Sequence, residues 1–222
     1  MLYIVPTPLG NLGDISQRAK DVLAACDFVI AENPSTTHKL LQLLKLDKKP
    51  IIQFADHNEK EVLKKYVERL QTETAALVSD AGTPGISDPG FRLVRACRKE
   101  GIKIVAIPGP SAAITALSAS GLPTDRFIFF GFLPKTEFKV VELVSLAKTS
   151  EATLVAYESP QRIIKTLEFI YQNFSIAPQV VIARELTKLH EEYLTGSPDE
   201  VLKILKAKPS IKGEITLLLS FK

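Results

Sequence analysis

Ser79-Asp80-Ala81-Gly82-Thr83-Pro84-Gly85-Ile86-Ser87-Asp88-Pro89-Gly90 is the stretch of sequence that most constrains the fold. It follows an apolar run at 75–79 that is typical of a buried strand, and it precedes a helical pattern at 91–98. It is longer than an ordinary connection of about 2–6 residues, and its three Gly, two Pro and two Asp constrain its backbone. Ligands bind at such carboxyl ends of strands in open α/β sheets. The stretch therefore predicts a binding loop at a sheet edge.

Strand and helix patterns alternate along the first 120 residues. This alternation predicts a mainly parallel, doubly wound sheet with helices on both faces. Residues 121–125 mark a change, after which the pattern favours a mixed sheet with antiparallel strands. We therefore predict an α/β fold with two α/β domains, at 1–120 and 121–222. Asp14 with Gln17 is typical of a capping box at the start of the first helix, and a second helix is expected over 37–44.

Composition limits the class of protein. The chain has 222 residues, 45% of them hydrophobic, and a formal net charge of +3, which is typical of a globular protein without a basic tail. Cys26 and Cys97 stand in no metal-like spacing, and the three His do not cluster with acids, so we predict buried thiols in a reducing compartment and no metal site. No signal peptide, membrane span, P-loop or hydrolase triad is indicated. A cytoplasmic protein without membrane contact is expected.

The loop after the first predicted strand has some parts of a dinucleotide site. Gly10 is followed about 20 positions later by Glu32 at the end of a strand. The full glycine motif is missing, however, and Pro6 and Pro8 lack the N–H groups that a diphosphate needs. A nucleoside without phosphates suits this loop better. The alternative is a tight turn beside a carboxylate.

Two further loops offer polar groups at strand ends. Asp80 can accept hydrogen bonds from a ligand ammonium or ribose, and Gly82 lets the backbone approach a ligand closely. Alternatively, Asp80 is a turn-forming carboxylate. Ser111, in the stretch 108–112, can cap the next helix, which does not exclude ligand contact.

Charged residues near other strand ends have less certain roles. Arg184 and Glu185 are adjacent in an extended segment, so their side chains point to opposite faces and one of them can line a cleft. The alternative is that both are structural surface charges. His57 follows the third predicted strand, where a functional residue and a capping residue are both possible.

Six segments that follow one another along nearly the whole chain carry a family resemblance: 6–15, 79–90, 107–112, 157–160, 183–188 and 212–214. Together they resemble the tetrapyrrole (corrin/porphyrin) methylase family, and within it the branch that methylates ribosomal RNA. The resemblance implies S-adenosylmethionine in a cleft between two α/β domains, and a homodimer. By motif position it implies cofactor contacts at Leu9, Asp80, Thr83, Ser111, Ala112, Tyr157 and Gly213, to which we add Gly82.

The resemblance also implies an activity, the 2′-O-methylation of a cytidine ribose in small-subunit ribosomal RNA, on the RNA or on the ribosomal subunit. We predict Glu185 or His57 as general base and Arg184 as the residue that orients a substrate phosphate. The branch pattern is altered at Asn33, which replaces an acid, and at Ser35, which replaces an arginine. Two alternatives therefore stay open: a methyltransferase for a tetrapyrrole or other small metabolite, and a non-catalytic relative that binds S-adenosylmethionine.

Overall fold

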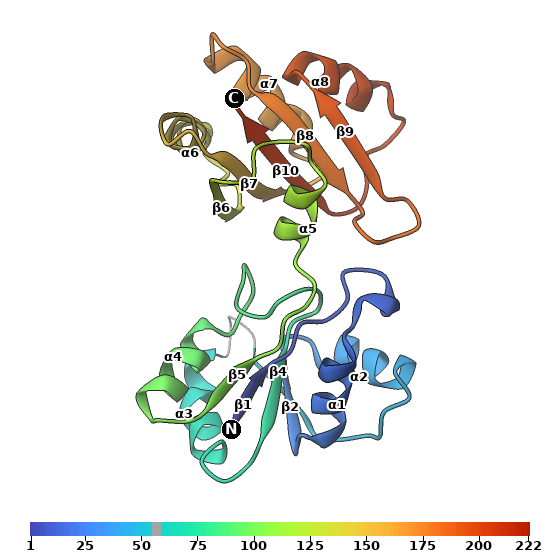
Figure 1. Ribbon diagram of the computed structural model, residues 1–222, viewed down its shortest axis with the longest axis vertical. Helices are drawn as coiled ribbons and strands as arrows, with labels where there is room; N and C mark the ends of the chain where they lie inside the picture. Colours follow the sequence, from blue (N-terminus) through green and yellow to red (C-terminus); the bar gives the residue numbers. More distant parts are fainter. Residues whose placement is uncertain (55–58) are drawn as a thin grey trace. The chain divides into compact units, whose positions relative to one another are not determined.

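A computed structural model describes residues 1–54 and 59–222, without the side chains of 59–61. The chain divides into two compact units, Met1–Ser111 and Ala112–Lys222 (Figure 1). The expected boundary near residue 120 differs from this division by the length of helix α5 (Ala112–Ser118). Ala113, Ala116 and Leu117 of α5 pack in one cluster with strands of the second unit, which places the helix there. The domain limits 1–120 and 121–222 stay a prediction.

The first unit is a parallel sheet of five strands in the order β3-β2-β4-β1-β5. Its strands are β1 (Leu2–Ile4), β2 (Phe28–Ala31), β3 (Ile51–Gln53), β4 (Ala75–Val78) and β5 (Ile104–Ala106). Its helices are α1 (Gln17–Ala25), α2 (Pro34–Leu43), α3 (Glu59–Arg69), α4 (Phe91–Lys99) and the short 3-10 helix η1 (Leu12–Asp14). The predicted doubly wound sheet is confirmed.

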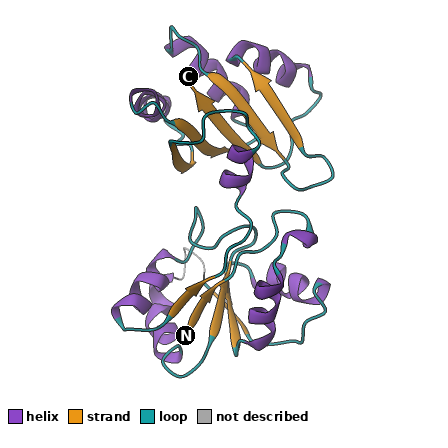
Figure 2. Cartoon of the chain, viewed as in Figure 1, coloured by secondary structure: helices purple, strands orange, loops and turns teal. Residues whose placement is uncertain are grey.

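Alternation along the strands divides the first core into two layers. On one face, Leu2, Phe28 and Leu77 pack with α3 and α4; on the other, Val29 and Ala76 pack with α1 and α2. Figures 1 and 2 show these two pairs of helices on opposite sides of the sheet. Because both faces are covered, the strands read as continuous apolar runs rather than as alternating ones.

The strand order places a switch point between β1 and β4. The connection from β1 runs through α1 on one face, whereas the connection from β4 runs through α4 on the other. The loops that follow these two neighbouring strands therefore diverge to opposite faces at their carboxyl ends, which is where α/β sheets of this kind bind ligands.

The second unit is a mixed sheet of five strands in the order β6-β7-β10-β8-β9, in which only β6 and β7 are parallel. Its strands are β6 (Phe127–Phe132), β7 (Thr153–Glu158), β8 (Gln179–Arg184), β9 (Glu192–Gly196) and β10 (Ile215–Ser220). Besides α5 it has α6 (Glu137–Thr149), α7 (Ile163–Asn173) and α8 (Pro198–Ala207), which pack on one face in the larger cluster. The predicted mixed sheet is confirmed.

Two helix starts differ from the sequence prediction. Ser16 caps α1, because its hydroxyl accepts a hydrogen bond from the Ala19 N–H at 3.1 Å. Asp14 lies in η1, so the predicted capping box there is wrong. Helix α2 begins at Pro34, earlier than expected, because the Asn33 side chain caps it by accepting a hydrogen bond from the Ser35 N–H at 3.0 Å.

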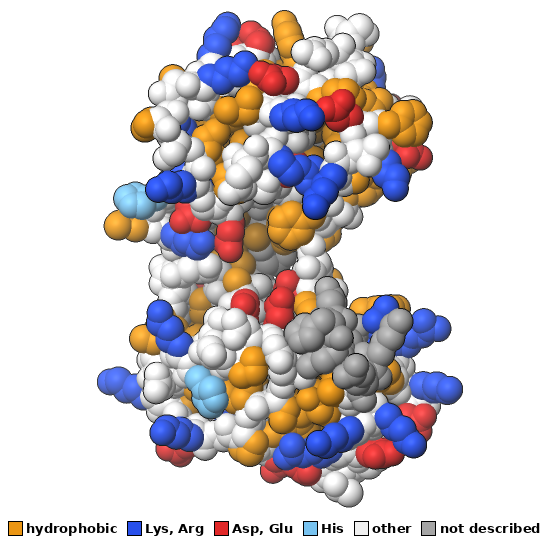
Figure 3. Space-filling model, turned by 180° about the vertical axis from the view of Figure 1, so that it is seen from behind, with side chains coloured by type: hydrophobic (Ala, Val, Ile, Leu, Met, Phe, Trp, Pro, Cys, Tyr) orange, Lys and Arg blue, Asp and Glu red, His pale blue; other side chains and the backbone are white. Residues whose placement is uncertain are grey.

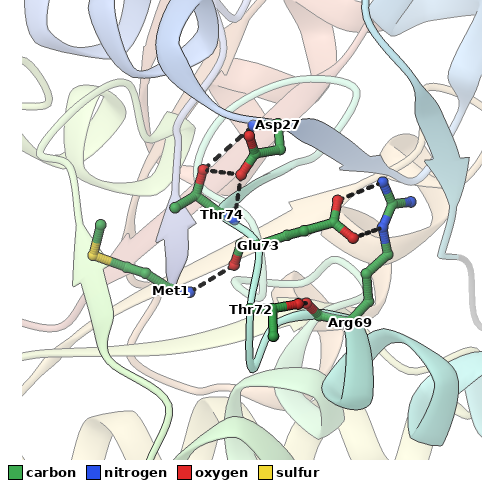
Figure 4. Close-up of polar contacts among 6 residues, drawn as sticks. All are labelled: Met1, Asp27, Arg69, Thr72, Glu73 and Thr74. Carbon is green, nitrogen blue, oxygen red and sulfur yellow. Dashed lines mark hydrogen bonds and ion pairs between the residues drawn. The ribbon is translucent and has the colours of Figure 1, made fainter.

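The amino-terminal edge of the first sheet carries a polar cluster, which we call the amino-edge cluster: Met1, Asp27, Arg69, Thr72, Glu73 and Thr74 (Figure 4). Asp27 accepts hydrogen bonds from the Thr74 N–H at 2.7 Å and from its hydroxyl at 2.8 Å. Arg69 and Glu73 form a two-bond pair at 2.8 and 2.7 Å. These donors lower the pKa of both carboxyls, Thr74 acting on Asp27 and Arg69 on Glu73. Every charge here therefore has a local partner.

Within the described residues, we find no helix that is both long and apolar enough to cross a membrane. Cys26 and Cys97 are both buried and both free, as predicted. Burial raises the pKa of the Cys97 thiol to about 11.

Candidate functional site

Three loops at the carboxyl edge of the first sheet hold one another in place; we call 6–13, 79–90 and 108–111 the carboxyl-edge loops. Thr7 and Gly82 exchange two backbone hydrogen bonds, at 2.9 and 3.0 Å, and form an isolated antiparallel bridge. The buried Thr7 hydroxyl also donates to the Ser79 carbonyl at 3.1 Å. The loops after β1 and β4 are therefore joined across the switch point.

The third loop is joined to the other two by close packing. The Thr83 hydroxyl donates to the Pro110 carbonyl at 2.8 Å. A Cβ on Gly109 would lie 2.7 Å from the Pro6 Cβ, and a Cβ on Gly82 would lie 3.3 Å from a Leu9 methyl group. The backbone at Gly82 also has a φ of +82°, which favours glycine. Glycine is therefore favoured at Gly109 by the lack of space and at Gly82 mainly by the backbone conformation.

Asp80 contacts a different element. Its carboxyl accepts hydrogen bonds from the Asn33 N–H and the Thr36 hydroxyl at the start of α2. Burial of the carboxyl nevertheless raises its pKa, and the two hydrogen bonds oppose this rise only in part. Because a carboxylate has about four acceptor positions, Asp80 keeps some for a ligand donor. Asp80 is exposed, so these positions are accessible to a ligand.

In the second unit, Glu185 and Gly213 form a tight contact. Glu185 adopts a left-handed conformation, with φ 53°, directly after β8. Its carboxylate accepts hydrogen bonds from the Lys188 ammonium at 2.9 Å and from the Glu214 N–H at 3.0 Å. A Cβ on Gly213 would overlap the Glu185 side chain. Lys188 and the Glu214 N–H lower the pKa of Glu185, which makes its carboxylate a weaker base.

Arg184 is held by a second set of partners. Its guanidinium donates to Glu192 at 3.0 Å and to the Lys212 carbonyl at 2.9 Å. Glu192 also pairs with Lys208 at 2.6 Å. Arg184 and Glu185 thus each bind the segment 212–214, from which the predicted contact at Gly213 comes.

Tyr157 lies among aromatic rings on the face of the second sheet that packs against α5. Its ring meets Phe129 edge-on, with 5.1 Å between the ring centroids, and Phe132 likewise at 5.5 Å. Phe129 and Phe132 come from the neighbouring strand β6, so the register of β6 and β7 sets this arrangement.

The predicted site residues are distributed as follows. Leu9, Gly82 and Thr83 come together in the carboxyl-edge loops, and Asp80 and Ser111 lie in the same loops. Ala112 is the first residue of α5, whereas Glu185 and Gly213 meet in the second unit. His57 lies outside the described residues.

Two residues that join these contacts were missed by the sequence reasoning. The sequence analysis assigns no role to Thr7, although a threonine between two prolines after a buried strand is a usable signal. It assigns none to Lys188 either, and only distances show that Lys188 pairs with both Glu185 and Glu214, the latter at 3.0 Å.

Comparison with known proteins identifies the family. The family model of the tetrapyrrole (corrin/porphyrin) methylases matches residues 1–202. The chain belongs to this family. The predicted family and the predicted class, an S-adenosylmethionine-dependent methyltransferase, are thereby confirmed.

Relatives within the tetrapyrrole methylases match over nearly the whole chain. One from Hydrogenobaculum sp. (strain Y04AAS1), named ribosomal RNA small subunit methyltransferase I, is 45% identical over 99% of this chain and 95% of its own length. A protein of the same name from Vibrio cholerae is 47% identical over 98% of this chain and 76% of its own length. Among solved structures, a diphthine synthase superposes with a TM-score of 0.78 at 15% identity, over 99% of this chain and 89% of that one. The fold is therefore that of the tetrapyrrole methylases.

The carboxyl-edge loops suit the cofactor of this family. S-adenosylmethionine is a nucleoside without phosphates, so it does not need the N–H donors that Pro6 and Pro8 lack. Its ammonium and ribose are hydrogen-bond donors, and the Asp80 carboxylate can accept from either. Within the described residues, no group of His, Cys, Asp or Glu could hold a metal ion.

Proposed function

We propose that the protein transfers a methyl group from S-adenosylmethionine to a cytidine 2′-hydroxyl of small-subunit ribosomal RNA. The near full-length identity of 45–47% to proteins named ribosomal RNA small subunit methyltransferase I carries this proposal. The proposed use of S-adenosylmethionine is supported by the interlocked carboxyl-edge loops, in which Pro6 and Pro8 lack the N–H groups that a diphosphate would need. The proposed acceptor is either the free RNA or the assembled ribosomal subunit. The protein is proposed to act as a homodimer in the cytoplasm.

The residues proposed for cofactor binding are Leu9, Asp80, Gly82, Thr83, Ser111, Ala112, Tyr157 and Gly213. When bound, S-adenosylmethionine supplies an electrophilic methyl group on a sulfonium. Leu9 adds an apolar side chain close to Gly82, where a Cβ would lie 3.3 Å from its methyl group, and Asp80 adds an acceptor and a negative charge. Most of the work of these residues is to position the reactants and to exclude water, because methyl transfer is a direct displacement.

The proposed acceptor hydroxyl is a poor nucleophile, so a base near it is useful. Glu185 and His57 remain the proposed candidates. The Lys188 ammonium lowers the pKa of Glu185 and weakens this carboxylate as a base. The close approach of the Glu185 side chain to Gly213 favours a positioning role for Glu185. Arg184 is proposed to orient a substrate phosphate, although Glu192 already neutralises part of its charge.

Incubation of the protein with labelled S-adenosylmethionine and small ribosomal subunits that lack the modification tests the proposal. We expect label in a ribose 2′-position of one cytidine, located by nuclease mapping. Protein-free RNA in a parallel reaction tells whether the free RNA or the subunit is the acceptor.

The alternatives give different results. Transfer to an added tetrapyrrole, with none to RNA, would support a metabolite methyltransferase. Cofactor binding without transfer to any acceptor would indicate a non-catalytic relative. In the Glu185→Gln variant, full turnover with unchanged cofactor affinity would remove Glu185 from the role of base.

A further inference from the structure

The end of strand β6 presents an aromatic ring to solvent. Phe132 is the last residue of β6, and 63% of it is exposed. One edge of the ring rests on Tyr157, with 5.5 Å between centroids. The next residue fixes the backbone, because the Leu133 N–H donates to the Tyr157 carbonyl at 3.0 Å and the Leu133 side chain is buried. The ring is therefore exposed but held in place.

An ion pair between a half-buried arginine and a buried glutamate holds the segment that follows this ring. The Arg162 guanidinium donates to the Leu133 carbonyl at 3.1 Å and to the Pro134 carbonyl at 2.6 Å. Its charge is balanced by Glu158 at 3.3 Å, whose side chain is fully buried. Glu158 in turn accepts from the Ser159 N–H and the Thr166 hydroxyl at 2.7 and 2.8 Å.

The cost of burying Glu158 indicates what this network does. An arginine–carboxylate pair with a buried carboxylate contributes little net stability, yet it fixes geometry well. Here both carbonyls of the turn after Phe132 are bound by one guanidinium. We call Glu158 and Arg162 the turn clamp.

Two lysines follow the exposed ring closely in the sequence. Lys135 and Lys139 are exposed, and no ion-pair partner of either is found in the described part of the chain. Glu137, which stands between them, is already paired with Lys165 at 3.0 Å. Figure 3 shows lysine and arginine side chains beside exposed hydrophobic ones on this unit. The segment 132–139 therefore combines a fixed aromatic ring with uncompensated cations.

We propose that Phe132 stacks on an unpaired base of the RNA substrate, with Lys135 and Lys139 on the adjoining phosphates, and that the turn clamp positions the ring for this contact. This proposal rests on the proposed RNA acceptor and extends it to a binding surface. Bases of single-stranded RNA stack on exposed aromatic side chains, and lysines bind the backbone as point charges. An apolar partner surface would leave the two lysines unpaired, so RNA is favoured.

Methylation kinetics with small ribosomal subunits test the stacking contact. We expect Phe132→Leu to raise the KM for the subunit about 5- to 100-fold with little change in kcat, because it removes the stacking ring and keeps an apolar side chain. Phe132→Trp should behave like the wild type. Phe127→Leu is the matched control, because Phe127 begins the same strand and is 41% exposed. It should leave the KM unchanged.

Four results would overturn the proposal. The first is an unchanged KM in Phe132→Leu. The second is a loss of S-adenosylmethionine affinity in Phe132→Leu, measured by calorimetry, that is as large as the rise in the KM for the subunit. The ring would then act through Tyr157 on the cofactor. The third is a loss of dimer in sedimentation, since Phe132 would then be a subunit contact. The fourth is a wild type that transfers nothing to RNA, which also removes the proposed function and is seen without any variant.

The turn clamp is tested by its coupling to the ring. Arg162→Lys keeps a charge beside Glu158 but loses the fork that binds two carbonyls. We expect a smaller rise in the KM for the subunit than in Phe132→Leu, with unchanged cofactor affinity. In the double variant the KM should equal that of Phe132→Leu alone. Additive effects would show that Arg162 acts independently of the ring and would overturn its positioning role.

Discussion

Asp80 and Asp27 lie at opposite edges of the same parallel sheet and differ in what their surroundings do to their charge. Asp27 precedes β2 in the amino-edge cluster, and hydrogen bonds from Thr74 lower its pKa. Asp80 follows β4 in the carboxyl-edge loops, and burial raises its pKa in spite of two donors. Thr74 of the same cluster binds the Asp27 carboxylate, whereas Asp80 interacts only with the start of α2 and keeps acceptor positions for a ligand. The proposed binding edge is therefore the one that carries Asp80.

The two edges also use different kinds of contact. Side-chain ion pairs and hydrogen bonds join the amino-edge cluster, as between Arg69 and Glu73. Backbone bonds and glycine contacts join the carboxyl-edge loops, as between Thr7 and Gly82. Backbone contacts leave side chains such as those of Leu9 and Asp80 available to a ligand. The following variants test this contrast.

The largest effect is expected from removal of the Asp80 carboxylate. Asp80→Ala should weaken S-adenosylmethionine binding by about 1.5–3 kcal/mol, roughly 10- to 100-fold, because a hydrogen bond to a charged group is lost. Isothermal calorimetry measures the change. Asp27→Ala at the other edge is the control and should keep the affinity. Equal affinities for the wild type and Asp80→Ala would argue against the assignment of the binding edge.

A glycine variant at each edge compares packing with open space. In Gly109→Ala the new Cβ would lie 2.7 Å from Pro6, which should push two carboxyl-edge loops apart and weaken both the fold and cofactor binding. The expected cost in unfolding free energy is about 1–3 kcal/mol, as for other overpacked sites. Gly101 precedes β5 and has no neighbour within 4 Å, so Gly101→Ala should add only backbone strain from its φ of +69°. Denaturant unfolding measures the stability of each variant, and calorimetry measures its cofactor affinity. An equal loss of cofactor affinity in Gly109→Ala and Gly101→Ala would contradict the difference between the two edges.

The hydroxyl bond from Thr83 to Pro110 makes a smaller contribution. Thr83→Val should lower the unfolding free energy by about 1 kcal/mol, because a partly buried hydrogen bond is lost at nearly constant volume. Thr72→Val is the matched change in the amino-edge cluster, where the exposed hydroxyl lies 3.5 Å from the Arg69 carbonyl. Its midpoint in a urea titration should stay at the wild-type value. A larger loss of unfolding free energy in Thr72→Val than in Thr83→Val would contradict the expectation that the hydroxyl bond at the carboxyl edge contributes more.

The smallest effects are expected on the Tm when the charge of Asp27 or of Asp80 is removed, and the two effects should have opposite signs. Because the pKa of Asp27 is lowered in the folded state, its ionised form stabilises the fold above its ordinary pKa, and this is lost as pH falls through the folded value. Because the pKa of Asp80 is raised, its ionised form opposes folding at neutral pH, and this cost disappears as pH falls through the folded value. Asp27→Asn should therefore lower the Tm at pH 7, and Asp80→Asn should raise it. Thermal scans showing the same sign for both would contradict this.

The fold could be predicted because its signals are local. The buried run 75–78 and the glycine- and proline-rich loop after it are visible in any short window of sequence. Helix starts were less certain: Asp14 and Ser16 are both good caps, and only the position of η1 decides for Ser16. At the start of α2 the local signal is Asn33, a capping side chain, followed by Pro34.

The role of the candidate site stays a prediction, and its contacts could be foreseen only in part, because contacts between distant segments depend on strand order. The loops of Gly82 and Thr83 were identified from composition alone. That Asp80 binds the start of α2 follows only from β2 lying beside β4, which no local pattern reveals. Likewise, the left-handed backbone at Glu185 and Thr187 turns Lys188 back onto Glu185, although the sequence suggests an extended segment there.

The bridge between Thr7 and Gly82 has a consequence for the order of assembly. β1 and β2 are consecutive in the chain but are separated in the sheet by β4, which pairs with both. A nascent chain that ends before β4 leaves the two strands without shared hydrogen bonds, and Thr7 without its partner 75 residues later. The contact between the loops that follow β1 and β4 is therefore made only after the central strand has inserted. A newly made chain therefore cannot form this part of the carboxyl-edge loops until β4 has joined the sheet.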